Sequence, residues 1–242
     1  MIARVAVIAA AVFLLSCRSL GFAAAGPADN DIQGEERIRV LDGLRERQRE
    51  VTTVRAMVVQ RKRHPLLRGE AISQGTLLFK RPNQVRWEVD TPERTIIVMD
   101  GHMLLVYRPD RNEAERRDLR GDVVSRAAAE FLTSGMGLDV TELEKRFRVE
   151  LYRESGRLVL KLTPRSRLVA QAVASVTIYQ DEADAIPRQI VVVGQKGDRT
   201  ETTLTQVIVN PRVSEDAFTL RLGPKVQVTD VGKPPGEGGS DR

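Results

Sequence analysis

The side chains that most often carry out chemistry are few in this chain of 242 residues, and they lie apart from one another. The chain has one Cys, Cys17, and two His, His64 and His102, and neither His lies near a paired Cys or an H-E-x-x-H motif. No Ser lies in a G-x-S-x-G turn, and no G-x-x-x-x-G-K-[ST] loop is present to bind a nucleotide phosphate. We therefore expect no metal, no cofactor and no enzymatic activity.

Carboxylates are plentiful, but they show no pairing typical of acid–base catalysis. Glu88 and Asp90 alternate with Val85, Trp87 and Val89, so we expect them to face solvent from one side of a strand. The 38 Lys and Arg exceed the 33 Asp and Glu, but the two signs are interspersed, as in Arg45-Glu46-Arg47. This mixing indicates a solvated surface and argues against nucleic-acid binding.

The N-terminus has the layout of an export signal over residues 1–25. Met1–Arg4 is short and basic, Val5–Leu15 is an apolar run too short to span a membrane, and small residues follow. Two processing sites are open. Leu14–Cys17 resembles the lipobox of bacterial lipoproteins, which would acylate Cys17, and Ala23–Ala25 is an A-x-A cleavage site. Either way, no Cys remains in the folded part to form a disulfide.

After a small, polar linker at 26–34, the apolar periodicity changes along the chain. Ile38, Leu41 and Leu44 recur at a spacing of three, which predicts a helix over Glu35–Glu50. Runs bounded by turn residues predict strands at Thr53–Arg63, Gly75–Arg81, Val85–Asp90, Arg94–Met99, His102–Tyr107, Phe147–Arg153, Arg157–Thr163, Ala174–Gln180, Arg188–Val193, Thr200–Val209 and from Phe218 toward Val228. Helices are predicted at Asp122–Thr133 and Thr141–Arg146, and a disordered tail at 229–242. The prediction is one mainly β (α+β) domain over 35–228.

Side-chain alternation defines an apolar face on the central strands. Leu77, Phe79 and Arg81 share one face of their strand, which places Arg81 at the rim of the apolar surface. In the two runs beside the Asp100-Gly101 hairpin signal both faces are apolar, which predicts a sheet covered on both sides. The two helical regions are the only covers that the sequence offers.

The stretch Gly75–Asp110, GTLLFKRPNQVRWEVDTPERTIIVMDGHMLLVYRPD, resembles the central signature of the periplasmic outer-membrane lipoprotein carrier (LolA) family. An apolar strand leads into K-R-P-N, followed by an R-W strand, a turn with Pro, an apolar strand to D-G and a strand ending in Y-x-P-D. Weaker matches follow at Leu158–Pro164, Thr200–Asn210 and Ser214–Leu220.

The resemblance implies an incomplete antiparallel β-barrel of about ten to eleven strands, with an N-terminal helix and a helical lid over an apolar cavity. In the family, this cavity receives the acyl chains of lipoproteins. Arg81 resembles the arginine that bonds the lid and holds the empty carrier closed. The expected lining residues are Leu77, Phe79, Val85, Trp87, Val89, Ile97, Met99 and Leu105.

The resemblance also implies a monomeric periplasmic carrier of acylated lipoproteins. Its partners would be an inner-membrane lipoprotein-releasing ABC transporter and an outer-membrane acceptor. The alternative is a lipid-anchored acceptor or envelope sensor built on the same half-barrel, which acylation of Cys17 would favour. One departure from the family pattern is the apolar insert His64–Gly69 (HPLLRG) between the first two strands.

Overall fold

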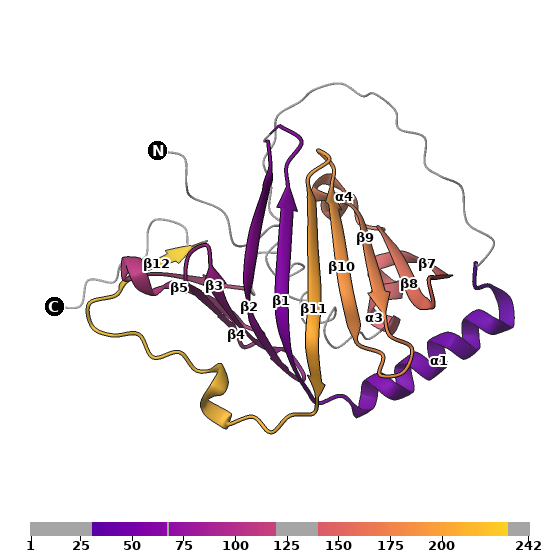
Figure 1. Cartoon of the computed structure of the whole chain (residues 1–242), viewed down its shortest axis with the longest axis horizontal. Helices are drawn as coiled ribbons and strands as arrows, with labels where there is room; N and C mark the ends of the chain where they lie inside the picture. The colour runs from indigo at the N-terminus through magenta and orange to yellow at the C-terminus, as the bar shows by residue number, and fades with distance from the viewer. Residues whose placement is uncertain (1–30, 67, 120–139, 232–242) are drawn as a thin grey trace.

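The computed structural model of the chain describes residues 31–66, 68–119 and 140–231, and its main feature is one strongly curled β-sheet (Figure 1). The strands are β1 (Thr53–Arg63), β2 (Glu70–Lys80), β3 (Gln84–Thr91), β4 (Thr95–Met99), β5 (Met103–Arg108), β6 (Glu113–Asp118), β7 (Phe147–Glu154), β8 (Arg157–Pro164), β9 (Val173–Gln180), β10 (Pro187–Gly194), β11 (Arg199–Val209) and β12 (Gln227–Val231). The helices are α1 (Gly34–Glu50), α3 (Val140–Arg146) and α4 (Arg167–Ala172), with short 3₁₀ turns η1 (Pro109–Arg111) and η2 (Glu215–Phe218).

The twelve strands of the described residues follow the order β12-β6-β5-β4-β3-β2-β1-β11-β10-β9-β8-β7. Every neighbouring pair is antiparallel except β12 with β6, which is parallel. Because β12 and β7 are separate edges, the sheet stays open. The predicted mainly β, incomplete barrel is confirmed. Strand β6 was not predicted, and β12 begins at Gln227, whereas a strand was predicted from Phe218 toward Val228.

The helices agree with the periodicity where they can be compared. The predicted helices at Glu35–Glu50 and Thr141–Arg146 correspond to α1 and α3, whereas the one predicted at Asp122–Thr133 lies outside the described residues. No helix in the described part of the chain has the length and apolar character needed to cross a membrane.

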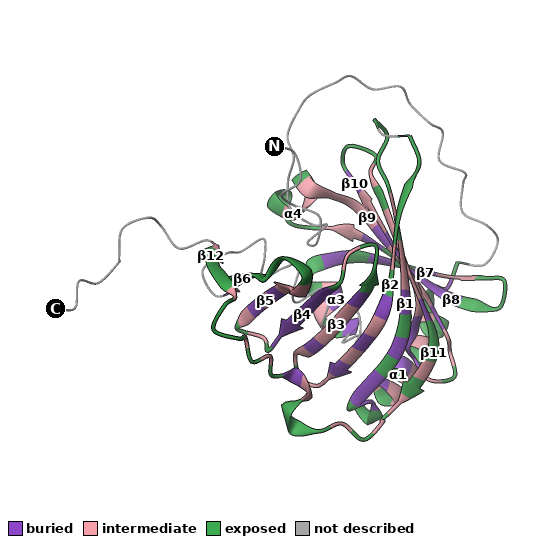
Figure 2. Ribbon diagram, turned by 60° about the vertical axis from the view of Figure 1, so that its left-hand side comes forward, coloured by how far each residue is buried: buried purple, intermediate pink, exposed green. Residues whose placement is uncertain are grey.

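One face of the sheet, here called the inner face, carries both buried clusters of the protein. The first cluster packs α1 and α3 against β7–β10, with Leu41 and Leu44 of α1 beside Leu160 and Ile178. The second lies on β1–β5 and β11. Figure 2 shows these buried stripes running along alternate positions of the strands.

Helix α1 is fixed to the sheet and to α3 by charged groups at the edge of the first cluster. Arg37 donates to Glu144 at 2.7 Å and to the backbone oxygen of Val149 at 3.2 Å. Arg45 pairs with the same carboxylate at 3.3 Å. Ile38 does not join the buried stripe, and its side chain is 60% exposed. Residues three apart on a helix are offset by about 60° around its axis, so the series 38, 41, 44 drifts around the helix. Ile38 therefore lies outside the buried stripe that contains Leu41 and Leu44.

The outer face has a cover that the sequence analysis did not anticipate. After β11, the chain crosses this face and η2 packs against β3 (Figure 1). Arg86, on the outer face, donates to the backbone oxygen of Ala217 at 3.1 Å. The expectation that only helical regions could cover the sheet is therefore wrong, because an irregular segment covers this face.

Candidate functional site

Two rows of directly opposed side chains cross the inner face from β1 to β5. One row consists of Ala56, Leu77, Trp87, Ile97 and Val106. The other consists of Val54, Phe79, Val85, Met99 and Leu104. Opposed apolar pairs of this kind make an unbroken apolar surface across five strands.

This apolar surface is closed in the structure. Apart from Trp87, the side chains of the two rows are at most 7% exposed, and they form one packed cluster that also contains Ile186 and Leu204. Any ligand on this face would therefore have to displace the groups that now cover these side chains.

Seven of the predicted lining residues share this face, namely Leu77, Phe79, Val85, Trp87, Val89, Ile97 and Met99. Leu105 does not, because it pairs with Val98 on the outer face. Met99 pairs with Leu104, so four residues separate the paired positions of the hairpin. Paired residues point to the same side of the sheet, so Leu104 lies on the inner face with Met99, and Val106 lies there with Ile97. Leu105, between them, points to the opposite side. That these residues bind lipid stays a prediction.

Trp87 differs from its neighbours on the inner face. Its side chain is only partly buried, yet its Nε1 atom is buried and has no hydrogen-bond partner in the described chain. A buried indole N–H without an acceptor is costly, because it has lost its bonds to water. A ligand that presents a carbonyl oxygen to Trp87 would satisfy this donor.

Arg81 lies at the rim of the inner face, as the alternation predicted. Its backbone N–H donates to the oxygen of Thr52 at 2.9 Å, which pairs it with the start of β1. Its side chain donates to two backbone oxygens at the C-terminal end of α1, from Nε to Val51 at 2.6 Å and from an Nη atom to Gln48 at 2.5 Å. These bonds join the apolar surface to α1. Whether Arg81 also bonds the predicted lid stays a prediction, because the predicted lid helix lies outside the described residues.

Two further polar residues, Gln48 of α1 and Lys62 of β1, were not predicted as part of the site. Gln48, in the last turn of α1, is 4% exposed, and neither of its amide atoms has a hydrogen-bond partner within the described residues. It continues the stripe of Leu41 and Leu44, and that position could have identified it.

Lys62 lies near the end of β1, where the inner face becomes polar. It follows Val54, Ala56, Val58 and Gln60 on alternate positions of β1, and its cross-strand neighbours are Ala71 and Thr200. Burial lowers the pKa of Lys62 below its ordinary value, because an ammonium loses hydration there. A lysine that continues the inward-facing positions of Val54, Ala56 and Val58 is the signal that could have identified it.

The remaining predicted site residue, Cys17, lies outside the described residues. Within 31–66, 68–119 and 140–231, no three His, Cys, Asp or Glu side chains are grouped to hold a metal ion. The two apolar rows and the donor of Trp87 provide a surface that suits an apolar ligand.

Comparison with known proteins gives a consistent result. The model of the family described as "Outer membrane lipoprotein carrier protein LolA" matches residues 49–221. An outer-membrane lipoprotein carrier protein of Chromohalobacter salexigens is 25% identical over 150 residues, covering 62% of this chain and 67% of the relative. One from Xylella fastidiosa is 28% identical over 159 residues, covering 64% and 71%.

A similar solved structure is that of an uncharacterized conserved protein from Thermus thermophilus. Its TM-score is 0.49 at 16% identity, with 81% of this chain and 99% of that chain covered.

Proposed function

Because the chain belongs to the LolA family, we propose that it is a periplasmic carrier that binds the acyl chains of lipoproteins on the inner face of its sheet and delivers them to the outer membrane. The observation that supports this proposal is the pair of apolar rows that cross β1–β5 without a break. Acyl chains are flexible and apolar, so a surface of aliphatic side chains with few polar groups suits them.

The closed state of this face is consistent with transfer of the cargo. Burying acyl chains gains about 0.8 kcal/mol per methylene. Three chains of roughly fifteen methylenes could then gain more than the roughly 20 kcal/mol at which non-covalent affinity saturates. A carrier must also release its cargo, and the cost of uncovering buried side chains such as Phe79 and Met99 opposes binding. Arg81 adds to this cost if its bonds to α1 break when the face opens.

The finer parts of the proposal concern partners and location. An inner-membrane lipoprotein-releasing ABC transporter would supply the cargo, and an outer-membrane acceptor would receive it. The second candidate, a lipid-anchored acceptor or envelope sensor, is favoured by the lipobox-like Leu14–Cys17. Comparing the chain with a Cys17→Ala variant distinguishes the two. An acylated protein partitions into detergent and the variant does not, whereas equal partitioning would contradict the anchor.

Two adjacent residues of β4 provide a matched test of where the cargo binds. Ile97 faces the inner face and Val98 the outer face, and each is 7% exposed. In a Cys17→Ala background, Ile97→Cys and Val98→Cys would each carry a single thiol. We expect a triacylated peptide to slow maleimide labelling of Ile97→Cys at least five-fold more than labelling of Val98→Cys.

Two controls complete this test. The same peptide without its acyl chains should protect neither thiol. Equal protection of the two thiols by the acylated peptide, or no protection at all, would contradict binding on the inner face.

A further inference from the structure

Three segments that are distant in sequence meet at one end of the molecule (Figures 1 and 2). They are the β1–β2 turn with Pro65, Leu66 and Arg68, the β10–β11 turn at 195–198, and α4. The backbone N–H of Gln195 donates to Ala172 of α4 at 3.2 Å. A Cβ atom on Gly197 would lie 3.3 Å from Cγ of Pro65, so the two turns also touch. We call this end the apex.

The apex exposes two large apolar side chains. Leu66, from the HPLLRG insert, is 87% exposed, and Leu168 of α4 is 48% exposed. Leu66 protrudes from a turn and Leu168 from the first turn of α4, so each is a single exposed side chain on a different segment. Protruding side chains can enter a fluid interface, because the lipid adapts to their shape.

Exposed cations outnumber carboxylates in the three segments that form the apex. Arg68, Arg167 and Lys196 are all exposed. None of the three forms an ion pair with any residue that the structure describes. Asp198 is the one carboxylate in these two turns and α4, so the apex keeps a net positive charge that can attract anionic groups outside the protein.

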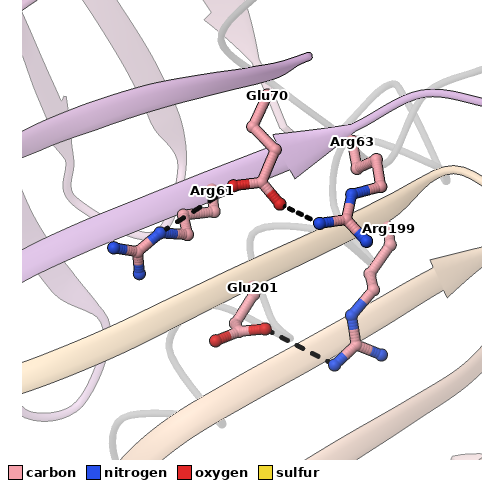
Figure 3. A pocket seen from close by; sticks show the side chains of 5 residues that line it. All are labelled: Arg61, Arg63, Glu70, Arg199 and Glu201. Carbon is pink, nitrogen blue, oxygen red and sulfur yellow. Dashed lines mark hydrogen bonds and ion pairs between the residues drawn. The ribbon is translucent and has the colours of Figure 1, made fainter. Parts of the chain in front are cut away.

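The surface below the apex adds to this charge. Arg61, Arg63, Glu70, Arg199 and Glu201 line a pocket of about 230 Å³ on the outer face (Figure 3). Glu70 is shared by Arg61 and Arg63, and Glu201 pairs with Arg199 at 3.4 Å. Two carboxylates thus face three guanidinium groups, and one positive charge remains.

We propose that the apex docks on an anionic membrane surface. Leu66 and Leu168 enter the interfacial layer, and Arg68, Arg167 and Lys196 bind the phosphates and other anionic headgroups of the lipids. Each basic residue held near such a surface strengthens binding about five-fold, and the attraction weakens with salt. The docking needs no cargo, so it is independent of the proposed function and can be tested apart from it.

The test is flotation of the processed, non-acylated protein, purified from cells expressing the Cys17→Ala chain, with phospholipid vesicles. We expect binding to vesicles of phosphatidylcholine with phosphatidylglycerol, and much weaker binding to phosphatidylcholine alone. The double variant Arg68→Glu/Lys196→Glu should bind the anionic vesicles at least about 25-fold more weakly, because it removes two positive charges and adds two negative ones. Leu66→Ser should lower binding roughly ten-fold.

Matched variants away from the apex control for charge and for apolar exposure. Arg212 and Arg221 are exposed in the segment between β11 and β12, and Ile208, 44% exposed, lies near the far end of β11. Arg212→Glu/Arg221→Glu and Ile208→Ser should float as the parent protein does, with circular dichroism confirming that every variant is folded.

Three results would overturn the proposal. They are equal binding to neutral and anionic vesicles, equal losses in the apex and control variants, and absence of binding at low salt. Apex-dependent binding to soluble polyglutamate without vesicle binding would also overturn it, and would assign the apex to an acidic protein.

Discussion

Arg81 donates a hydrogen bond from Nε to the backbone oxygen of Val51, the residue at the C-terminal cap of α1, at 2.6 Å. A second bond from the same guanidinium reaches the oxygen of Gln48, in the last turn of the helix. Backbone oxygens at a helix C-terminus have no partner within the helix, so a cation there satisfies them and interacts favourably with the helix dipole. One side chain thus ties the end of β2 to the end of α1.

Replacing Arg81 should weaken the attachment of α1. Each bond to the charged guanidinium contributes about 1.5–3 kcal/mol, and we expect Arg81→Leu to lower the free energy of unfolding by about 2–4 kcal/mol. Arg81→Lys should recover less than half, because an ammonium cannot reproduce the fork of the guanidinium. Urea denaturation measures these changes, and amide hydrogen exchange should show faster exchange in α1.

Arg86→Leu is the matched control, since it removes a partly buried arginine that bonds Ala217 on the outer face. If Arg81 also controls access to the inner face, Arg81→Leu alone should change the rate at which a bound acylated peptide is released. Equal release rates in the two variants would limit Arg81 to a structural role.

Asn210 holds the end of β11 to the connection between α1 and β1. Its Oδ1 accepts from the backbone N–H of Thr52 at 2.8 Å and from the Thr52 hydroxyl at 3.0 Å, and its Nδ2 donates to the oxygen of Glu50 at 2.9 Å. Its φ is 53°, in the left-handed region. The side-chain bonds and the backbone conformation can therefore be separated by mutation.

We expect Asn210→Gly to lower the free energy of unfolding by about 1–2 kcal/mol, through loss of the side-chain bonds. Asn210→Ala should be less stable than Asn210→Gly by about 1 kcal/mol, because Ala disfavours positive φ. This order reverses the usual advantage of Ala over Gly. Thermal unfolding of both variants measures it, and a more stable Asn210→Ala would contradict the backbone explanation.

The sequence predicts most of this fold because its strands alternate clearly between apolar and polar positions. Strand β1 lies where predicted, and β3, β4 and β5 differ by one residue at their ends. Strand β6, EAERRD, was missed because it lacks that alternation and is held partly by ion pairs. Arg108 pairs with Glu115 at 2.9 Å, and Arg116 with Asp230 at 2.6 Å. Such cross-strand charge pairs are visible only once the register is known.

The site was predictable to the extent that local alternation determines it. Leu77, Phe79, Val85 and Trp87 follow from period-two spacing within two strands joined by a short turn. Leu105 was misplaced because the face of a strand also depends on the length of the preceding loop. Strand β12 extends to Val231, inside the segment predicted to be a disordered tail. The sequence did not reveal this strand end, because β12 pairs with β6, which is far from it in the sequence.

Lys62 should make the stability of the protein depend on pH in the alkaline range. Burial lowers its pKa in the folded state, whereas the unfolded chain keeps the ordinary value of 10.5. The folded state therefore binds this proton less tightly, and the resulting penalty is full below the folded pKa and disappears as pH rises toward 10.5. We expect Lys62→Met to be more stable than the parent at pH 7, and the gain to shrink as pH rises.

Urea denaturation between pH 7 and 10.5 measures this difference. Burial raises the pKa of Tyr152 and Tyr179, but both are present in the two proteins and cancel in the comparison. Lys225→Met, at an exposed position, should show no such trend. A gain that is constant with pH would mean that Met stabilises by packing alone.

Trp87 is the only Trp of the chain, so its emission reports on the inner face directly. We expect a triacylated peptide to shift the emission maximum of the protein saturably, because acyl chains would displace side chains packed around the partly buried indole. The same peptide without acyl chains should cause no shift, and far-ultraviolet circular dichroism should stay unchanged. Equal responses to the two peptides would contradict an acyl-binding face, even in a member of this family.

Replacing Trp87 with Phe tests whether its unpaired N–H has a role. Phe keeps an aromatic ring on the inner face but lacks the donor, so the variant loses ring volume and also removes an unsatisfied buried group. These effects oppose each other, and we expect the free energy of unfolding to change by less than about 1.5 kcal/mol. If the N–H bonds a carbonyl oxygen of the cargo, the affinity for the triacylated peptide should fall about three- to ten-fold, the value of one neutral hydrogen bond. Calorimetric titration measures this, with Val98→Ala on the outer face as the control. Unchanged affinity in Trp87→Phe would show that the indole N–H does not contact the cargo.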